Sequence, residues 1–369
     1  MRGGEISGNT AESQFSGEGD GGGVIVQDNG TFNMKGGEIF GNSALGFSSG
    51  WERGGGVFNH RGGTFQISNG IIHGSHAAEH LRNTAYHRSR NAALYSAGTW
   101  MGQPGGTSRF GTFDNAGRFT ELGTLRTTSG TIHVVEGELQ LPQEYDLLNQ
   151  FAWVRELGQD GGEYTFELSG DETIAPQSLN WTGINDVTII LRGSVPSTLS
   201  LSETRGSLFS IGSGFTLVLD DNITLQGRDD NNTSLVEVGG TLVMNEGARI
   251  TGNTGLGGRG VRVNSGGVFI LDGGEISGNS TTDTGWQATA PGQGGGVRVE
   301  SGGRFDMLLG TISGNTGQNG GGVFVANNGI FQISNGIIHG SDAEEELPNV
   351  ARGNGASLHG TDRHVRQRR

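Results

Sequence analysis

The chain has 369 residues, of which 72 are glycine, six are proline and none is cysteine, so disulfides and thiolate metal sites are excluded. The formal net charge of −14 argues against a nucleic-acid duplex or an anionic membrane as partner, because both require a basic surface. No apolar run reaches the ~18 residues of a transmembrane helix, so we expect no membrane insertion by this segment.

The first predicted element, residues 1–75, is an array of repeats built on strings of the type I-[ST]-G-N. The strings are irregularly spaced, but removing the variable segment that follows each one leaves a unit of 22 residues every time. The unit is clearest at Gly294–Asn315, which reads GGGVRVESGGRFDMLLGTISGN. The isoleucines of the strings are Ile6, Ile39 and Ile72 in the first array and Ile250, Ile276, Ile312 and Ile338 in the second.

Three short alternating pieces recur inside each unit: V-x-V, F-x-M/I/L and a piece centred on the isoleucine. Alternation with a period of two predicts strands that bury one face. Three short strands per 22 residues therefore predict an all-β fold, a parallel β-helix solenoid in which each strand stacks on its equivalent in the next rung.

Two columns of small and polar residues are expected at one corner of this solenoid. A glycine follows each string's isoleucine by two positions, as Gly278 does, and we expect it to need a left-handed backbone. The next residue is expected to hydrogen-bond from rung to rung, as stacked asparagines do. Its members are Asn9, Asn42, Asn253, Asn279 and Asn315, with Ser75 and Ser341 at the ends of the arrays.

The string FQISNGIIHGS occurs twice, at Phe65–Ser75 and at Phe331–Ser341, 266 residues apart. Related strings follow both copies, at His76–Ala85 and at Asp342–Ala351. This predicts a tandem module of that length, with FQISNGIIHGS as the last rung of each array. We expect the chain to be a piece of a longer polypeptide made of such modules.

Residues 76–141 are rich in glycine and threonine and contain strand-like pieces, so we predict a small β-rich element that closes the first array. An amphipathic helix is predicted over residues 142–158, with Leu147, Phe151 and Val154 on one face. We expect it to cap the open end of the second array, residues 163–341. Residues 342–369 are predicted as the start of a second closing element and a basic, disordered tail.

The strings GGGV and ISGN resemble the glycine-rich, right-handed parallel β-helix repeats of bacterial surface proteins; GGGV stands at Gly21, Gly54, Gly294 and Gly320. That group includes adhesin-like proteins and polymorphic outer-membrane proteins. The resemblance implies a right-handed, pectin-lyase-like solenoid that is secreted or displayed on the bacterial surface or outer membrane and takes part in adhesion. Its partners would be an extracellular glycan, a host or matrix protein, or neighbouring modules of the same polypeptide.

Candidate catalytic and metal-binding residues are few. The string HAAEH at His76–His80 has the H-x-x-E-H spacing of one class of zinc peptidases. Because the corresponding string of the second module is DAEEE, we expect no metal and no cofactor. Glu5, Glu38 and Glu275 share one outward column, which we expect to be a solvated acidic stripe rather than a cation site.

Paired carboxylates keep an alternative function open, because they serve acid–base catalysis in polysaccharide lyases and hydrolases, some of which are β-helices. The candidates are Asp220, Asp221, Asp229 and Asp230, which lie in turn-like strings. We expect these residues to be ordinary turns and assign no catalytic residue.

The variable segments are the more informative candidates, since all of them leave the repeat at the same position. Insertions on one side of a solenoid often form its binding face, and the long ones here carry aromatic residues that suit a sugar ring or a protein surface. We therefore predict a non-catalytic, adhesin-like protein that binds a glycan or a protein through these loops. The candidate ligand-binding residues are Phe47, Trp51, Glu52, Arg53, Trp286 and Gln287.

Overall fold

The computed structural model describes residues 1–12, 21–45, 54–60, 62–85, 93–96, 107–125, 128, 131–142, 145–257, 259–281, 293–340 and 348–352. The chain forms two compact units, Met1–Gln159 and Asp160–Arg369. Strands dominate both, and α1 (Leu147–Leu157) is the one helix of the described residues. The predicted all-β class is therefore confirmed.

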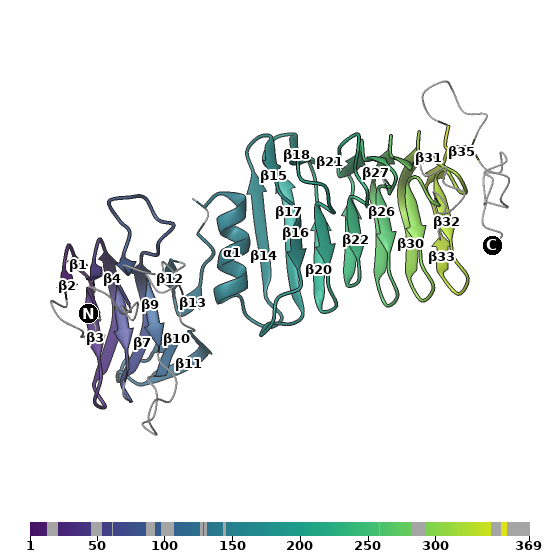
Figure 1. Ribbon diagram of the computed structural model, residues 1–369. Coiled ribbons are helices and arrows are strands. Elements are labelled where there is room, and N and C mark those ends of the chain that lie inside the picture. The colour runs from purple at the N-terminus through teal and green to yellow at the C-terminus, as the bar shows by residue number, and fades with distance from the viewer. Residues whose placement is uncertain are drawn as a thin grey trace. The chain divides into compact units, whose positions relative to one another are not determined.

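The largest sheet of the second unit has 12 strands, which form two parallel rows (Figure 1). The rows join where β27 (Val268–Ser277) and β30 (Arg304–Ser313) run from one row into the other. In β27 the bend lies at Gly273 and Gly274, whose φ angles of 124° and 68° favour glycine. The first row also holds β14 (Glu163–Leu168), β17 (Val187–Gly193), β20 (Phe215–Leu219), β23 (Thr241–Asn245) and β33 (Ile330–Ile333), and the second holds β15 (Glu172–Ile174), β18 (Ser197–Leu201), β21 (Ile223–Gln226), β24 (Arg249–Thr251) and β34 (Ile337–Ile338).

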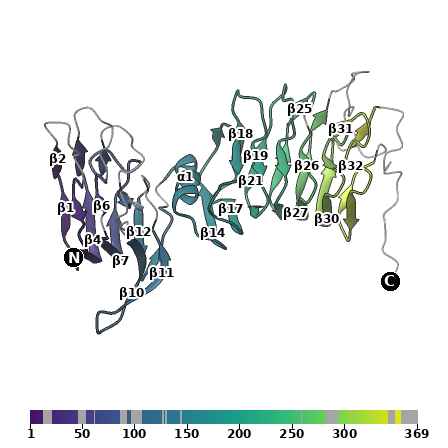
Figure 2. The same ribbon diagram turned by 60° about the horizontal axis from the view of Figure 1, so that its bottom comes forward.

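Two smaller parallel sheets complete the second unit (Figure 2). In both, as in the large sheet, each strand pairs with its equivalent from the neighbouring repeat, as the repeat predicted. The sheet that contains the V-x-V pieces, called here the V-x-V sheet, holds β16 (Gln177–Leu179), β19 (Phe209–Ile211), β22 (Val236–Val238), β26 (Val261–Val263), β29 (Val297–Val299) and β32 (Val323–Val325). The other holds β25 (Thr254–Gly255), β28 (Ser280–Thr281), β31 (Thr316–Gly317) and β35 (Val350–Ala351).

The first unit repeats this arrangement with fewer strands. Its main sheet holds β1 (Glu5–Ser7), β4 (Thr31–Phe40), β7 (Thr64–Ile72), β10 (Thr107–Phe113), β11 (Phe119–Thr124), β12 (Ile132–Val135) and β13 (Glu138–Leu139). Its two small sheets hold β2 (Thr10–Glu12), β5 (Ser43–Leu45) and β8 (Thr84–Ala85), and β3 (Val24–Val26), β6 (Val57–Asn59) and β9 (Leu94–Ser96). The units therefore share one strand order per repeat.

Equivalent apolar residues stack inside each unit. The rings of Phe269, Phe305 and Phe331 are parallel, with centroid separations of 4.7 and 4.9 Å between neighbours. Burial of such ladders stabilises the fold by about 25 cal/mol per Å² of apolar surface. The predicted equivalence of the isoleucines is confirmed by the strand register, which pairs Ile6 with Ile39, Ile39 with Ile72, Ile250 with Ile276, Ile276 with Ile312 and Ile312 with Ile338.

The two predicted corner columns are also present. Asn279 is fully buried; its Nδ2 donates to Asn315 Oδ1 over 3.0 Å, and its Oδ1 accepts from the backbone N–H of Asn253 over 3.1 Å. The left-handed backbone is confirmed at Gly8, Gly41, Gly252, Gly278 and Gly314, with φ between 61° and 68°. It is not found at Gly74 and Gly340, the glycines of the two FQISNGIIHGS strings, so the prediction is wrong at the last string of each array. Sequence inspection missed three members of the ladder, namely Asn83, Asn231 and Asn349.

The first array extends beyond its predicted end at residue 75. Strands β8, β9 and β10 pair in parallel with β5, β6 and β7, so a further turn of strands follows the string at Phe65–Ser75. The chain returns to the corner at Asn83, which takes the ladder position in place of Ser75. Strand β35 likewise continues the second array past residue 341. The antiparallel strands β11, β12 and β13 then close the first unit.

Helix α1 begins later than predicted. Asp146 caps it, with Oδ1 accepting from the backbone N–H of Asn149 over 2.8 Å, so the first helical residue is Leu147 rather than Pro142. The predicted apolar face is buried. Trp153, also buried, donates from Nε1 to the Thr131 carbonyl over 2.7 Å and so ties the helix to the closing strands of its own unit.

Candidate functional site

All variable segments leave the repeat between the same two kinds of strand. In the first unit they follow β2, β5 and β8, which pair with one another, and precede β3, β6 and β9, which also pair. In the second unit they follow β25, β28 and β31 and precede β26, β29 and β32. The end points of the segments are thus stacked in each unit, and we call this line of connections the insertion edge.

The six predicted ligand-binding residues belong to these insertions. Phe47, Trp51, Glu52, Arg53, Trp286 and Gln287 lie outside the described residues. The described residues that flank the two insertions are Leu45 and Gly54 in one, and Thr281 and Gln293 in the other. The residues that the structure does describe at this edge of the second unit form a charged cluster on the outer face of the V-x-V sheet.

The cluster lies in one outward column of the V-x-V sheet. The register pairs Glu237 with Arg262, Arg262 with Arg298, and Arg298 with Phe324. These side chains point outward, because the valines on either side of Glu237, Arg262 and Arg298 are buried, as is Val323 before Phe324. Glu300 joins the column, with its Oε1 at 2.7 Å from Arg262 Nε and 2.8 Å from Arg298 Nε. The Arg298 guanidinium also lies over the ring of Phe324, 5.8 Å from its centroid.

Arg259 adds a third guanidinium at the edge of the cluster. It stands in the string GRGV, where other repeats have the second glycine of GGGV. Its Nε donates to the carbonyl of Gln293, the residue that follows the long insertion, over 3.2 Å. The side chain is only 8% exposed, and no carboxylate of the described residues forms an ion pair with it. A buried guanidinium without a carboxylate partner is a group that an oxyanion would stabilise.

The electrostatics of the cluster reflect this excess of positive charge. Burial, helped by Arg298 and Arg262, lowers the pKa of Arg259 to about 10. A drop of that size opposes the charged form by roughly 3 kcal/mol. Burial by itself would raise the pKa of Glu300, but Arg298 and Arg262 hold it below its ordinary value. The cluster therefore holds three guanidinium groups against two carboxyl groups, those of Glu237 and Glu300, which suits an anionic group of a ligand.

The acidic turns do not form one site. The strand β21 separates Asp220 and Asp221 from Asp229 and Asp230, and its four residues span about 13 Å. Asp220 accepts from Asn245 Nδ2 over 2.9 Å. Asp230 forms ion pairs with Arg205 (2.9 Å) and Arg228 (2.6 Å), whose hydrogen bonds lower its pKa. An ionised, paired carboxylate is a poor general acid.

The remaining candidates bring no metal-binding group together. Among the described residues, no three His, Cys, Asp or Glu side chains are placed to hold a metal ion. His76 contacts the ring of Tyr145 edge-on at a centroid distance of 6.3 Å, within a segment of turns rather than on a helix. Glu5 and Glu38 are register partners in the first unit, and Glu38 Oε2 lies 3.5 Å from His73 Nε2.

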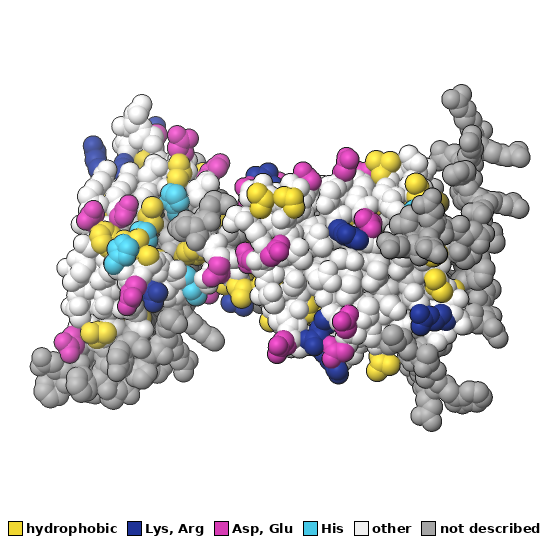
Figure 3. All heavy atoms as spheres, turned by 90° about the horizontal axis from the view of Figure 1, so that it is seen from above, with side chains coloured by type: hydrophobic (Ala, Val, Ile, Leu, Met, Phe, Trp, Pro, Cys, Tyr) yellow, Lys and Arg dark blue, Asp and Glu magenta, His cyan; other side chains and the backbone are white. Residues whose placement is uncertain are grey.

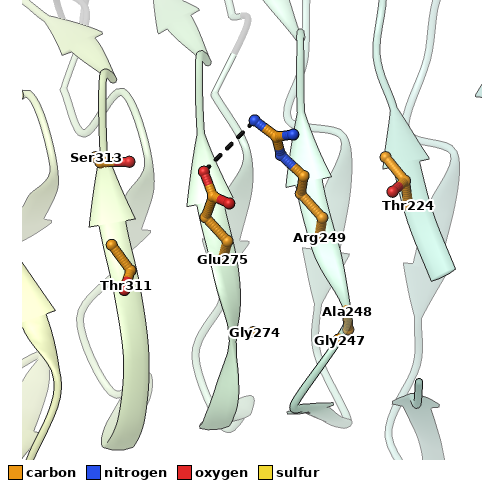
Figure 4. Close-up of a pocket in the computed structure, with 8 residues that line it drawn as sticks. All are labelled: Thr224, Gly247, Ala248, Arg249, Gly274, Glu275, Thr311 and Ser313. Atoms are coloured by element: carbon orange, nitrogen blue, oxygen red, sulfur yellow. Dashed lines mark ion pairs between the residues drawn. The ribbon is translucent and has the colours of Figure 1, made fainter. Parts of the chain in front are cut away.

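A shallow hollow on the outer face of the second row contains Glu275 (Figure 4). Arg249 and Glu275 point toward each other, 3.4 Å apart, between the hydroxyl side chains of Thr224 and Thr311. Both charges are thus already paired. On the face in Figure 3, acidic and basic side chains are scattered over a largely uncharged surface. The hollow offers a ligand hydroxyl groups but no free charge.

Sequence inspection missed the arginine cluster, although two signals for it exist. The string V-R-V occurs in consecutive repeats, at Val261–Val263 and Val297–Val299, which places two arginines on one outward column. Arg259 replaces a glycine of the repeat.

No described helix is long and apolar enough to cross a membrane. Comparisons with protein-family models, with curated proteins and with solved structures found no match.

Proposed function

We propose that each unit is a segment of a right-handed parallel β-helix solenoid, in which the 22-residue unit contributes three short strands. The first residues of the variable segments add a short fourth strand, at β2 and β5 in the first unit and at β25, β28 and β31 in the second. The parallel pairing of each strand with its equivalent in the next repeat supports a solenoid. The right hand is the expected one, because crossover connections between parallel strands are right-handed in nearly all proteins.

We further propose that the chain is a non-catalytic, adhesin-like binding protein, displayed outside a bacterial cell, that holds an extracellular glycan or protein along the insertion edge. One observation carries the proposal: the insertions start and end at stacked positions of a regular strand scaffold. Loops that emerge from one side of such a scaffold present a continuous surface to a ligand.

The alternative, a polysaccharide lyase or hydrolase, needs carboxylates gathered in one groove. The four candidate aspartates lie at the two ends of β21, and Asp230 is held in ion pairs with two arginines. The described residues therefore give no support to a catalytic function.

The arginine cluster narrows the proposed ligand to one that carries an anionic group. Arg259 lies beside the insertion edge with its charge unpaired among the described residues, and Phe324 presents an aromatic ring next to Arg298. A sugar that carries a carboxylate suits this surface, since the Arg259 guanidinium can bind the acid while the ring of Phe324 can pack against the sugar.

The test is a binding panel of neutral and acidic polysaccharides and matrix proteins. We expect Trp51→Ala and Trp286→Ala to weaken binding at least tenfold, and Arg259→Met to weaken binding of the acidic ligands only. Trp181→Ala is the matched control, because Trp181 packs on Phe215 at 5.4 Å, away from the insertion edge. Unchanged binding by both tryptophan variants would refute the proposed site, and equal loss on neutral and acidic ligands with Arg259→Met would refute the anionic group.

A further inference from the structure

The string FQISNGIIHGS provides an internal comparison, because identical residues occur in two surroundings. In the first copy Phe65, Ile67 and Ile72 are fully buried. In the second copy Phe331, Ile333 and Ile338 are all partly exposed. Ile337 is 56% exposed. Since the sequence is the same, the difference comes from what lies beside each strand.

Strand β7, which carries the first copy, is paired on both edges. On one edge it pairs with β4. On the other edge β10 pairs in parallel with its first half, Thr107 opposite Thr64, and β12 pairs antiparallel with its second half, Ile132 opposite Ile72. The turn after β12 adds two hydrogen bonds, from the Glu136 N–H to Asn69 Oδ1 (3.0 Å) and from the Gly137 N–H to the Ser68 carbonyl (2.9 Å).

The second copy has the same inner neighbours, but the described part of the chain gives it no outer ones. Strands β33 and β34 pair with β30, and no described strand pairs with their other edge. The side chains of Ser334 and Asn335, which correspond to Ser68 and Asn69, are exposed. The rest of the surroundings is the same in both units: Asn349 and β35 occupy the places that Asn83 and β8 occupy in the first unit.

We infer that the free edge of β33 and β34 is a docking site for two strands equivalent to β10 and β12, supplied by a following copy of the module. The register would repeat that of the first unit: the counterpart of Thr107 opposite Ile330, and the counterpart of Ile132, antiparallel, opposite Ile338. The inference goes beyond the proposed function, since it concerns how modules join and needs no ligand.

The residues of the edge favour this occupant over an unrelated strand. A single added strand would run either parallel or antiparallel to the whole edge. In the first copy the edge instead takes two strands: β10 pairs in parallel with Thr64–Ile67, and β12 pairs antiparallel with Gly70–Ile72, where the chain bends at Gly70. Ser334 and Asn335 lie at that bend and retain the groups that bind the β12–β13 turn in the first unit. Unpaired strand edges readily accept further strands, so this edge needs a partner to avoid nonspecific association.

The experiment extends the chain. Residues 353–369 are replaced by a second copy of residues 87–159, and amide hydrogen exchange is measured by mass spectrometry. Peptides of the two strings are distinguishable because Ile330 stands where Thr64 does. In the unextended chain we expect the amides of residues 331–338 to exchange at least tenfold faster than those of residues 65–72, since exchange reports local opening. In the extended chain we expect the two segments to exchange at the same rate.

The matched control is the same extension with Thr107→Pro and Ile132→Pro introduced in the added copy only, since the Thr107 N–H donates to the Gly63 carbonyl in the first unit. Proline removes a backbone donor and disrupts strand pairing, so we expect the fast exchange of residues 331–338 to return. The inference is overturned if the extension leaves that exchange unchanged, or if the proline control protects equally well. Protection in the unextended chain that grows with protein concentration would also overturn it, because the edge would then pair with a second copy of itself.

Discussion

At the scale of single residues, the asparagine ladder shows why one amide recurs in every rung. The Nδ2 of Asn279 donates to the carbonyls of Ile250 and Ser277 and to Asn315 Oδ1, and its Oδ1 accepts from the Asn253 N–H. Each amide thereby satisfies backbone groups of two adjacent rungs inside the corner. Serine, which follows the glycine in FQISNGIIHGS, is too short for this role, and the next asparagine replaces it.

Replacing a ladder residue should therefore be costly. We expect Asn279→Ala to lower the free energy of unfolding of the second unit by about 3 kcal/mol, because it leaves several buried polar groups without partners. Urea denaturation measures this. The control is Asn232→Ala, whose side chain is exposed, and which we expect to change stability by less than about 0.5 kcal/mol. Equal effects of the two substitutions would contradict a structural role for the ladder.

A pH-dependent contribution belongs to Glu300. Its pKa is lowered in the folded chain by Arg298 and Arg262, against the effect of burial. A lowered carboxyl pKa stabilises the folded state above the ordinary value near 4.5, and this contribution is lost as the pH falls through the lowered pKa.

We expect Glu300→Gln to cost roughly 2 kcal/mol at pH 7, because Arg298 is left buried without its partner, and the difference from the parent chain to shrink as the pH falls below 4.5. Urea denaturation at pH 7 and pH 3 measures it. Glu167→Gln is the control, because the Glu167–Arg192 pair is exposed and is expected to contribute little at either pH. A cost that is the same at both pH values would show that packing, not charge, is responsible.

At the scale of elements, the GGGV string is explained by close approach of backbones. At Gly295 an added Cβ would lie 2.4 Å from the Thr316 carbonyl oxygen and 2.6 Å from that of Gly321. The first glycine has a different reason, since Gly294 and Gly320 have φ of 69° and 63°. The string at Gly294–Val297 therefore combines a turn that needs positive φ with a strand start that has no room for a side chain, unlike the preceding repeat, where Arg259 occupies the second position.

Gly295→Ala should consequently destabilise the second unit, by about 3 kcal/mol, as overpacking against rigid backbone does. Thermal and urea unfolding measure the change. Gly170→Ala is the matched control, because no heavy atom lies within 4 Å of its added Cβ and its φ is not positive. There we expect a gain of about 0.5 kcal/mol, from reduced entropy of the unfolded chain. A tolerated Gly295→Ala would show that the corner can relax.

At the scale of the whole molecule, the chain contains two units built from the same repeat and the same strand order. Antiparallel strands and a helix follow the parallel strands of the first unit, while in the second unit no described strand pairs with the outer edge of β33 and β34. Each unit has its own insertion edge, which is defined by the strand pairs of that unit. The proposed binding surface and the proposed module junction thus lie on different parts of the scaffold, the first along the rungs and the second at their end.

The sequence by itself determined the repeat length, the alternation within strands, the isoleucine and phenylalanine ladders and the corner asparagines. These features are local and recur in every rung, so comparison of rungs reveals them. It also predicted a helix, but placed its start at Pro142 because the cap at Asp146 was not recognised.

Only the tertiary structure decided which residues meet across the variable insertions. Arg259 contacts Gln293 and lies near Arg298, although the insertion that separates them in sequence follows no periodic rule. The structure also showed that strands β8–β10 continue the first array and that, among the strands it describes, none pairs with the outer edge of β33 and β34. Strand pairing joins residues distant in the chain, so a local pattern predicts that a strand forms but not which strand lies beside it.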